Sequence, residues 1–429
     1  METITKNNIK KYSTYKNSGV EWLGEIPEHW DLTRLGTRFE ERKTKVSDKD
    51  FAPLSVTKNG TVPQLASAAK SNDGDNRKLV KKGDFVINSR SDRKGSSGIA
   101  YQDGSVSLIY IVLEPLNIQP IYCNYLLKSY TFIEEFYRMG HGIVADLWTT
   151  RYHEMKSIIV GIPPLSEQTK IAEFLDDKTK KIDEAIAIKS QQINLLKERK
   201  QILIHKAVTR GLDTNVKLKN SGVEWIGEIP VGWEVKRLKY VCFINRNSLP
   251  ETTKKDFTFK YVDIGSVNLE KGILETEEYL FKKSPSRARR ITKSGDTIIS
   301  TVRTYLKAID FINEEKSKFI YSTGFAILEP KSFMFPEFLA NFVRSDAFTE
   351  QVTINSKGMS YPAINSTDLS KLFIVHPNLK EQKEISSYIE KSSEKIARAI
   401  GLKSEEISTL KEYKSSLINS VVTGKVRVC

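Results

Sequence analysis

A fifteen-residue segment near the start of the chain returns almost unchanged near its middle. Residues 16–30 read KNSGVEWLGEIPEHW and residues 219–233 read KNSGVEWIGEIPVGW, with 12 of the 15 positions identical. A long internal repeat means that one supersecondary arrangement is built more than once. The 429 residues are therefore expected to fold as two related modules of roughly 200 residues, each large enough to bury its own core.

Two further segment pairs extend this repeat. Residues 163–175 match residues 377–389, both containing a Pro-x-Leu-x-Glu-Gln pattern, and residues 185–211 match residues 399–425. The offset between copies is 203 residues at the first motif and 214 at the later ones. The second copy therefore has about eleven extra residues in its middle.

The middles of the two copies share only landmarks. Gly83-Asp84 and Leu113-Glu114-Pro115 have counterparts at residues 295–296 and 328–330, but most residues between them differ. A duplicated enzyme is expected to keep its reactive residues in both copies. A duplicated recognition protein keeps the frame and varies the surface, so the pattern favours recognition of two different ligands.

Short β-rich runs bounded by Gly, Pro, Asp and Ser predict strands at residues 85–88, 106–113, 297–302 and 325–328. Apolar periodicity predicts helices at residues 122–137 and 336–348. Each middle is therefore expected to be a mixed α/β module. Residues 166–208 and 380–422 contain no Pro and only one Gly, Gly401, and predict two long helices.

The long helices have a heptad pattern of apolar residues, which predicts a coiled-coil seam. Because the two copies are related, we expect the pair to be antiparallel, with a pseudo-two-fold relation. The alternative is that each helix packs only on its own module. The predicted seam positions are Ile186, Ile193, Leu196, Leu203, Ile400, Ile407, Leu410 and Leu417.

Motifs for catalysis are absent from the sequence. There is no phosphate-binding Gly-rich loop for a nucleotide, no dinucleotide-binding Gly pattern and no Asn-Pro-Pro-aromatic signature of an amino-methyltransferase. The five histidines are scattered, without spacing suited to a metal ion. The sequence therefore predicts a chain that is no enzyme and binds neither metal nor cofactor.

Positive charge and aromatic residues remain as candidates for function. The net charge is +14, and basic loop clusters lie at matching places in the two middles, as phosphate neutralisation requires. A nucleic acid is the predicted ligand of these clusters, although a merely solvated basic loop is the alternative for any one residue. The predicted DNA-binding residues are Arg77, Lys78, Asn88, Ser89, Arg90, Arg93, Lys94 and Arg151 in the first copy, and Arg287, Arg289, Arg290, Thr301, Arg303, Tyr305, Lys307, Lys357 and Tyr361 in the second.

The chain resembles the DNA-specificity subunit of Type I restriction-modification systems. Four features together carry this resemblance: the doubled SGVEW(L/I)GEIP motif, the Pro-x-Leu-x-Glu-Gln helix start, the helix end in VTRG or VTGK, and the two divergent middles. The resemblance covers residues 16–427. It implies that the ligand is double-stranded DNA, and that each middle is a target recognition domain for one half of a bipartite, asymmetric sequence. It also implies that the helix pair sets the gap between the halves.

The resemblance further implies partners. Two adenine-N6 methyltransferase (modification) subunits would dock on the helices, and motor-nuclease restriction subunits would join them. S-adenosylmethionine, ATP and magnesium would belong to those partners. The predicted parts are a first recognition domain at 1–161, a first spacer helix at 162–213, a second recognition domain at 214–375 and a second spacer helix at 376–429.

Several expectations concern class and location. Three widely separated cysteines, and an N-terminus without an apolar stretch, predict a cytoplasmic protein with no membrane association. The resemblance implies that this protein comes from a bacterium or archaeon. The main alternative function is a coiled-coil scaffold whose basic modules bind protein or RNA.

Overall fold

The structure is a computed structural model that describes residues 10–67, 74–142 and 148–428. The chain forms two compact units. Unit 1 comprises Met1–Ser190 and Ser404–Cys429, and unit 2 comprises Gln191–Lys403. Both units end inside the long helices, so the four-part division at residues 161, 213 and 375 remains a prediction.

Unit 1 is built around a sheet of four strands in the order β10-β9-β12-β4, with all neighbours antiparallel. Its centre is β9 (Phe85–Asn88), which is buried along its whole length. A three-stranded sheet, β11-β8-β5, and three two-stranded sheets, β1-β2, β13-β3 and β6-β7, complete the β-structure. The remaining strands are β1 (Tyr15–Asn17), β2 (Glu25–Pro27), β3 (Asp31–Arg34), β4 (Phe39–Glu41), β5 (Lys45–Val46), β6 (Leu54–Thr57), β7 (Gly60–Pro63), β8 (Arg77–Val80), β10 (Ser97–Ile99), β11 (Gly104–Val106), β12 (Tyr110–Pro115) and β13 (Ile159–Ile162).

Two predictions for unit 1 need correction. The strand expected at residues 106–113 is two strands, β11 and β12, separated by a turn at residues 107–109. The helix expected at residues 122–137 is also two, α1 (Pro120–Leu127) and α2 (Tyr130–Arg138). Ser129 breaks it, because its buried hydroxyl donates to the Leu126 carbonyl and accepts from the Phe132 amide. A short helix, α3 (Tyr152–Met155), precedes β13.

Unit 2 repeats this frame with sheets in the orders β17-β26-β23-β24 and β21-β18-β25-β22, and with two-stranded sheets β14-β15, β16-β27 and β19-β20. The buried strand β23 (Thr297–Ser300) takes the place of β9. The other strands are β14 (Leu218–Asn220), β15 (Glu228–Pro230), β16 (Glu234–Arg237), β17 (Cys242–Ile244), β18 (Thr258–Val262), β19 (Val267–Asn268), β20 (Gly272–Ile273), β21 (Glu277–Leu280), β22 (Ala288–Ile291), β24 (Ile309–Phe311), β25 (Ile320–Ser322), β26 (Phe325–Pro330) and β27 (Phe373–His376).

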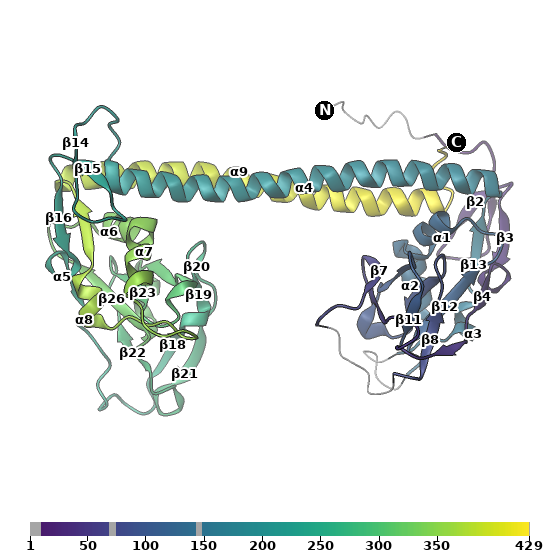
Figure 1. Ribbon diagram of the computed structural model, residues 1–429, viewed down its shortest axis with the longest axis horizontal. Helices are drawn as coiled ribbons and strands as arrows, with labels where there is room; N and C mark the ends of the chain where they lie inside the picture. The colour runs from purple at the N-terminus through teal and green to yellow at the C-terminus, as the bar shows by residue number, and fades with distance from the viewer. Residues whose placement is uncertain (1–9, 68–73, 143–147, 429) are drawn as a thin grey trace. The chain divides into compact units, whose positions relative to one another are not determined.

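The helices of unit 2 lie beside the β23–β26 sheet (Figure 1). They are α5 (Leu238–Val241), α6 (Pro336–Arg344), α7 (Asp346–Asn355) and α8 (Ser366–Lys371). The single helix expected at residues 336–348 is divided into α6 and α7. Ser345, fully buried between them, donates its hydroxyl hydrogen bond to the Phe342 carbonyl. Ser345 occupies the position of Ser129 in unit 1, so the two copies share this break.

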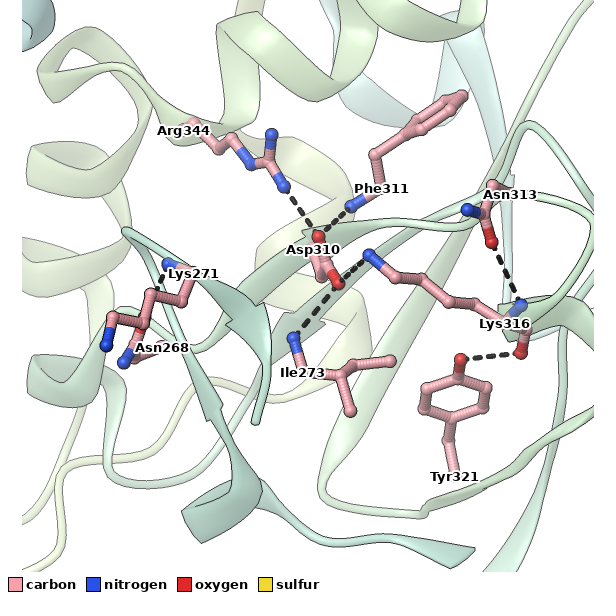
Figure 2. A network of polar contacts seen from close by, with 9 residues as sticks. All are labelled: Asn268, Lys271, Ile273, Asp310, Phe311, Asn313, Lys316, Tyr321 and Arg344. Atoms are coloured by element: carbon pink, nitrogen blue, oxygen red, sulfur yellow. Dashed lines mark hydrogen bonds and ion pairs between the residues drawn. The ribbon is translucent and has the colours of Figure 1, made fainter. Parts of the chain in front are cut away.

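The surplus residues of the second copy are concentrated in one place. Two residues join β6 to β7, whereas fourteen join β18 to β21 and include the hairpin β19-β20. Asp310 of β24 fixes this hairpin, because its buried carboxylate accepts a hydrogen bond from the Ile273 amide at 3.2 Å. Lys316 and Arg344 each form a 2.7 Å ion pair with the same carboxylate (Figure 2).

The two long helices match their predicted bounds closely. Helix α4 runs over Leu165–Arg210 and α9 over Leu379–Val422. Within unit 1 they are antiparallel, because Asp183 pairs with Lys414 at 2.7 Å and Lys189 pairs with Glu406 at 2.6 Å. Within unit 2, Lys403 donates a 2.6 Å hydrogen bond to Gln192. The eight predicted seam residues are all half-buried.

Each unit's core contains helix residues from both halves of the chain. In unit 1, Ile171 and Leu175 from the start of α4 pack in one core with Val421 and Val422 from the end of α9. In unit 2 the end of α4 and the start of α9 exchange these places, with Ala207, Val208, Ile385 and Ile389 in one core. Each helix therefore packs on its own module at its start and on the other module at its end.

Candidate nucleic-acid interface

The repeated motifs are explained by the frame, so they are poor candidates for a recognition surface. Trp30 is fully buried and its indole N–H donates to Glu167; Trp233 does the same with Glu381. The Gln168 amide oxygen accepts from the Gln119 backbone, where α1 begins. Gln382 accepts from the Phe335 backbone, where α6 begins. In each unit, the Glu-Gln pair at the start of a long helix thus connects that helix to the module before it.

The Gly-Asp landmarks also belong to the frame. Gly83 and Gly295 have φ of 96° and 94°, a backbone conformation that glycine adopts without strain. Asp84 and Asp296 each accept a hydrogen bond from the backbone amide three residues earlier. In unit 1, Arg42 forms a 2.7 Å ion pair with Asp84, and this hydrogen bond raises the pKa of Arg42.

In unit 2 the position of Arg42 is occupied by Asn245. Both residues donate their backbone N–H to the strand beside them, Arg42 to Val112 and Asn245 to Ile327. Asp296 is buried, and that burial raises its pKa to about 6. The carboxylate of this turn is therefore paired with an arginine in one unit, whereas in the other burial makes its ionisation less favourable.

The loops that follow β9 and β23 are the best candidate surface. Residues 89–96 follow β9 and are joined to a second loop, residues 140–151, by the backbone bridge between Arg90 and Thr149. Residues 301–308 follow β23 and are joined to residues 355–365 by the bridge between Val302 and Ala363. We call these two loop pairs the recognition loops of units 1 and 2. Residues 143–147 lie outside the described part of the chain.

Predicted site residues of the first copy divide into two groups. Arg90, Arg93 and Arg151 are exposed in the recognition loops, and Lys94 is exposed there beside Glu134, at 2.6 Å. Asn88 and Ser89 are buried at the loop's base, where the Ser89 hydroxyl donates to the Ile109 carbonyl.

Arg77 and Lys78 lie away from these loops, in β8. The buried Arg77 guanidinium donates to the hydroxyl and the carbonyl of Ser105. The Lys78 ammonium donates to Glu41 and to the Tyr110 carbonyl. These hydrogen bonds give both side chains a structural role, which does not fit their prediction as DNA-binding residues.

The second copy divides in the same way. Arg303, Tyr305, Lys357 and Tyr361 are exposed in the recognition loops, and the Arg303 guanidinium lies 5.2 Å from the centre of the Tyr361 ring. Lys307 is half-buried, 3.7 Å from Asp346. The Thr301 hydroxyl donates to the Gly324 carbonyl, which fixes the loop's first residue.

Three arginines of the second copy lie before β23 rather than in the recognition loops. Arg287 is exposed and 3.3 Å from Asp263. Arg289 is half-buried over the Phe281 ring, at 4.8 Å. Burial lowers the pKa of Arg290. These three form a separate group beside β22, so the structure does not bring the predicted residues of this copy into one cluster.

A cavity of about 600 Å³ adjoins the recognition loops of unit 1. Lys94 and Trp148 of the loops line it together with Glu21 and Trp22 of the repeated motif. The Trp22 indole N–H is buried without a hydrogen-bond acceptor among the described residues. Sequence reasoning missed this juxtaposition, because the motif and the loops are far apart along the chain.

Apolar residues in the recognition loops were also missed. Met359, within residues 355–365, is fully exposed, and Ile354, at the end of α7 just before that segment, is 58% exposed. In the sequence, only the Gly and Tyr content of residues 355–365 indicated that this segment could form part of a binding surface. Among the described residues, no group of three His, Cys, Asp or Glu side chains is placed to hold a metal ion, and no helix is long and apolar enough to cross a membrane.

Comparisons with known proteins agree with this two-unit description. A family model for the Type I restriction modification DNA specificity domain matches residues 27–198 and 230–407. The Type I restriction enzyme MjaVIII specificity subunit of Methanocaldococcus jannaschii is 25% identical, over 94% of each chain. The putative type I restriction enzyme MjaX specificity subunit of the same organism is 24% identical, over 95% of this chain and 96% of that protein.

Solved structures show the same fold. A chain from a study of complex assembly and conformational transition in a type I R-M system aligns with a TM-score of 0.67 and 16% identity, covering 92% of this chain and 98% of that one. The HsdS subunit of Thermoanaerobacter tengcongensis aligns with a TM-score of 0.53 and 17% identity, covering 94% and 98%.

Proposed function

The chain belongs to the Type I restriction-modification DNA specificity family, and from this we propose that its two units each recognise one half of a bipartite, asymmetric DNA sequence. The observation that supports this proposal best is the pair of recognition loops. They follow the same buried strand in both units and are bridged in the same way, yet they differ in sequence. A shared frame with different loops is what recognition of two different half-sites requires.

Phosphates and bases make separate demands on these loops. Arg90, Arg93 and Arg151 in unit 1, and Arg303 and Lys357 in unit 2, supply exposed positive charge for the phosphates. Side chains at the loop tips then discriminate between base edges. We propose no catalytic group and no cofactor for this chain, and assign S-adenosylmethionine, ATP and magnesium to the partner subunits.

The long helices are proposed to set the gap between the half-sites and to dock two adenine-N6 methyltransferase subunits, which motor-nuclease restriction subunits join. The ion pairs of Asp183 with Lys414 and of Lys189 with Glu406 support a fixed antiparallel register. Many charged residues of both helices stay exposed, which leaves surface for partners. A scaffold that binds protein or RNA is not favoured by the family assignment.

The recognition proposal can be tested by mapping N6-methyladenine in genomic DNA. The cells used carry this chain with its partner subunits. One two-part motif with unequal halves is expected. Exchange of residues 214–375 for those of a relative should change one half and leave the other intact. A change in both halves would contradict independent recognition.

The spacing proposal can be tested by lengthening both long helices by one turn, about 5.4 Å. The insertions are made at Ile193 of α4 and at the facing position beside Lys403 of α9. The tolerated gap should lengthen while both half-sites stay the same. An equal insertion at Asn215, in the exposed segment after α4, is the matched control and should leave the gap unchanged. Altered half-sites with an unaltered gap would refute the spacing role.

A further inference from the structure

The recognition loops of unit 2 expose more apolar surface than a solvated loop needs. Single exposed apolar side chains are common on proteins, but a group of them on two joined loops indicates contact with another molecule. We call this group the tip patch. Its members, with exposed fractions, are Val302 (37%), Tyr305 (57%), Leu306 (38%), Met359 (102%) and Tyr361 (65%).

The patch stands on a firmly closed loop. Lys357 and Ala363 exchange two backbone hydrogen bonds of 2.8 Å, and the Ile364 amide donates to the Thr301 carbonyl at 2.9 Å. The hydroxyls of Thr304 and Ser356 join the two loops at 2.9 Å. Met359 therefore lies at the tip of a short loop that hydrogen bonds close. Its exposure is a property of this closed backbone.

Backbone strain accompanies this arrangement. Arg303 and Lys307 have φ of 52° and 45°, in the left-handed region that residues other than glycine seldom adopt. Such conformations cost about 1–3 kcal/mol each and are concentrated at functional sites. Here the Arg303 guanidinium lies 5.2 Å from the centre of the Tyr361 ring, and Tyr361 belongs to the same closed loop as the exposed Met359.

A ligand for this patch must offer negative charge at the edge and apolar surface at the centre. Lys357, in the same closed loop as Met359, and Arg303, over the Tyr361 ring of that loop, supply exposed positive charge. A DNA duplex has this pattern, since phosphates lie outside and the flat faces of the bases lie between them. Side chains such as Met and Leu are known to enter between base pairs and to unstack them.

We infer that Met359 inserts between two stacked base pairs of the half-site bound by unit 2, with Tyr361 and Arg303 supporting it from behind. The inference rests on the proposed function and adds a mechanism to it: part of the specificity at this half-site comes from how readily a base step unstacks. Flexible pyrimidine–purine steps are the expected sites, because unstacking costs least there.

The described part of unit 1 does not provide the same device. Its recognition loop after β9 has Arg90, Ser91, Asp92, Arg93 and Lys94 in the places that unit 2 fills with Val302 to Leu306. Trp148, 38% exposed, is the large apolar residue of its second loop in that part. The inference therefore concerns the half-site of unit 2.

The test uses the full chain and a target duplex with 2-aminopurine at successive positions of both half-sites, since its fluorescence rises on unstacking. The half-site of unit 2 is identified by the exchange of residues 214–375. The wild-type chain should raise the fluorescence at one step of that half-site. Met359→Ala should abolish the rise and weaken specific binding about tenfold, whereas Met359→Leu should keep both.

Val231→Ala is the matched control, because Val231 is an exposed apolar residue (53%) of the same unit in a different segment, and it should change neither signal. Fluorescence that survives Met359→Ala would overturn the inference. A loss of affinity on replacing thymine with uracil, equal to the loss with Met359→Ala, would also overturn it, since it would indicate contact with thymine methyl groups. A wild-type chain that shows no sequence preference would refute the proposed function itself.

Discussion

The recognition loops of the two units occupy the same place in the same frame but differ in chemistry. In unit 1 the loop after the buried strand is ionic, with Arg90, Arg93 and Lys94. In unit 2 the matching loop exposes Val302, Tyr305 and Leu306, and its strained backbone orients Arg303. The hydrogen bonds from Trp to Glu and from backbone to Gln that join each module to its helix are the same in both units.

The comparison shows which positions have been free to change. Residues that connect strand, hairpin and helix are fixed by buried hydrogen bonds, whose loss costs about 1–3 kcal/mol each. Beyond the ends of β9 and β23, a few hydrogen bonds at the base of the loops, such as those of Ser89 and Thr301, fix the backbone, and the exposed side chains differ between the units. The units also differ inside the frame, where Asp310 of unit 2 stands at the position of Gly98 in unit 1. Four predictions test how deep these differences go.

The largest effect is expected at Asp310. Asp310→Asn should destabilise unit 2 by about 3–5 kcal/mol, because Lys316 and Arg344 would lose their buried partner. Chemical denaturation with hydrogen exchange resolved by unit measures this change. Asp263→Asn is the control, because the half-buried Asp263 carboxylate pairs with the exposed Arg287 and its other contact, a hydrogen bond from the Tyr261 hydroxyl, can be kept by an amide oxygen; this variant should cost under about 1 kcal/mol. Equal losses from the two variants would contradict the role assigned to Asp310.

The two Gly-Asp turns should respond to the same substitution with opposite signs. The raised pKa of Asp296 means that its contribution to stability is fully present below about pH 4 and is lost as pH rises through about 6. At pH 8, Asp296→Asn should therefore stabilise unit 2 by up to about 3 kcal/mol. Asp84→Asn should destabilise unit 1 by about 2–4 kcal/mol, since Arg42 would lose its buried partner.

Unfolding followed between pH 4 and pH 8 measures both changes, with each unit monitored separately by hydrogen exchange. The stabilising effect of Asp296→Asn should fade towards pH 4, where the wild-type carboxyl is protonated. A stabilising effect that is unchanged at pH 4 would show that the raised pKa is not its cause.

A smaller difference is expected at the glutamates that bind the repeated tryptophans. Glu167 interacts with Tyr12, His29 and Trp30, whereas Glu381 accepts from Trp233. Glu167→Gln should cost about 2 kcal/mol and Glu381→Gln about 1 kcal/mol. Thermal unfolding of the two variants measures the difference, and a larger cost at Glu381 would contradict it.

The smallest effect is expected in the helix seam. Lys189 pairs with a carboxylate, Glu406, whereas its repeat counterpart Lys403 donates to the neutral Gln192. Gln192→Glu should make the two contacts alike and stabilise the pair by about 0.3–1 kcal/mol at low salt. The gain should shrink at high salt, because exposed ion pairs are screened. A gain that does not depend on salt would mean that charge pairing is not its cause.

The repeat predicted the frame of this fold, including the long helices to within a few residues. It could not predict the breaks at Ser129 and Ser345, because a serine inside an apolar stretch becomes a helix break only when its hydroxyl is buried against the preceding turn. Nor could it place the surplus residues of the second copy, which the hairpin β19-β20 largely accounts for. The offset between the repeats gives the number of surplus residues but not their place in the fold.

The candidate surface was predicted in part. Arg90, Arg303 and Tyr361 are exposed in the recognition loops, as a basic and aromatic loop pattern suggested. Arg77 and Lys78 looked the same in sequence, but a carbonyl and a hydroxyl inside unit 1 bind Arg77, and a carbonyl and a carboxylate bind Lys78. Met359 gave no signal, since a methionine is usually a core residue and only the closed loop around it keeps it outside.

The exchanged helix ends have a consequence for the order of folding during synthesis. Unit 2 is one continuous stretch, Gln191–Lys403, but the core of unit 1 needs Val421 and Val422, which are translated after the whole of unit 2. Domains generally fold as they emerge from the ribosome, the N-terminal one first. Here that order is reversed: the unit translated first is completed last, when the final turns of α9 reach it and the backbone of Arg427 pairs with that of Lys10.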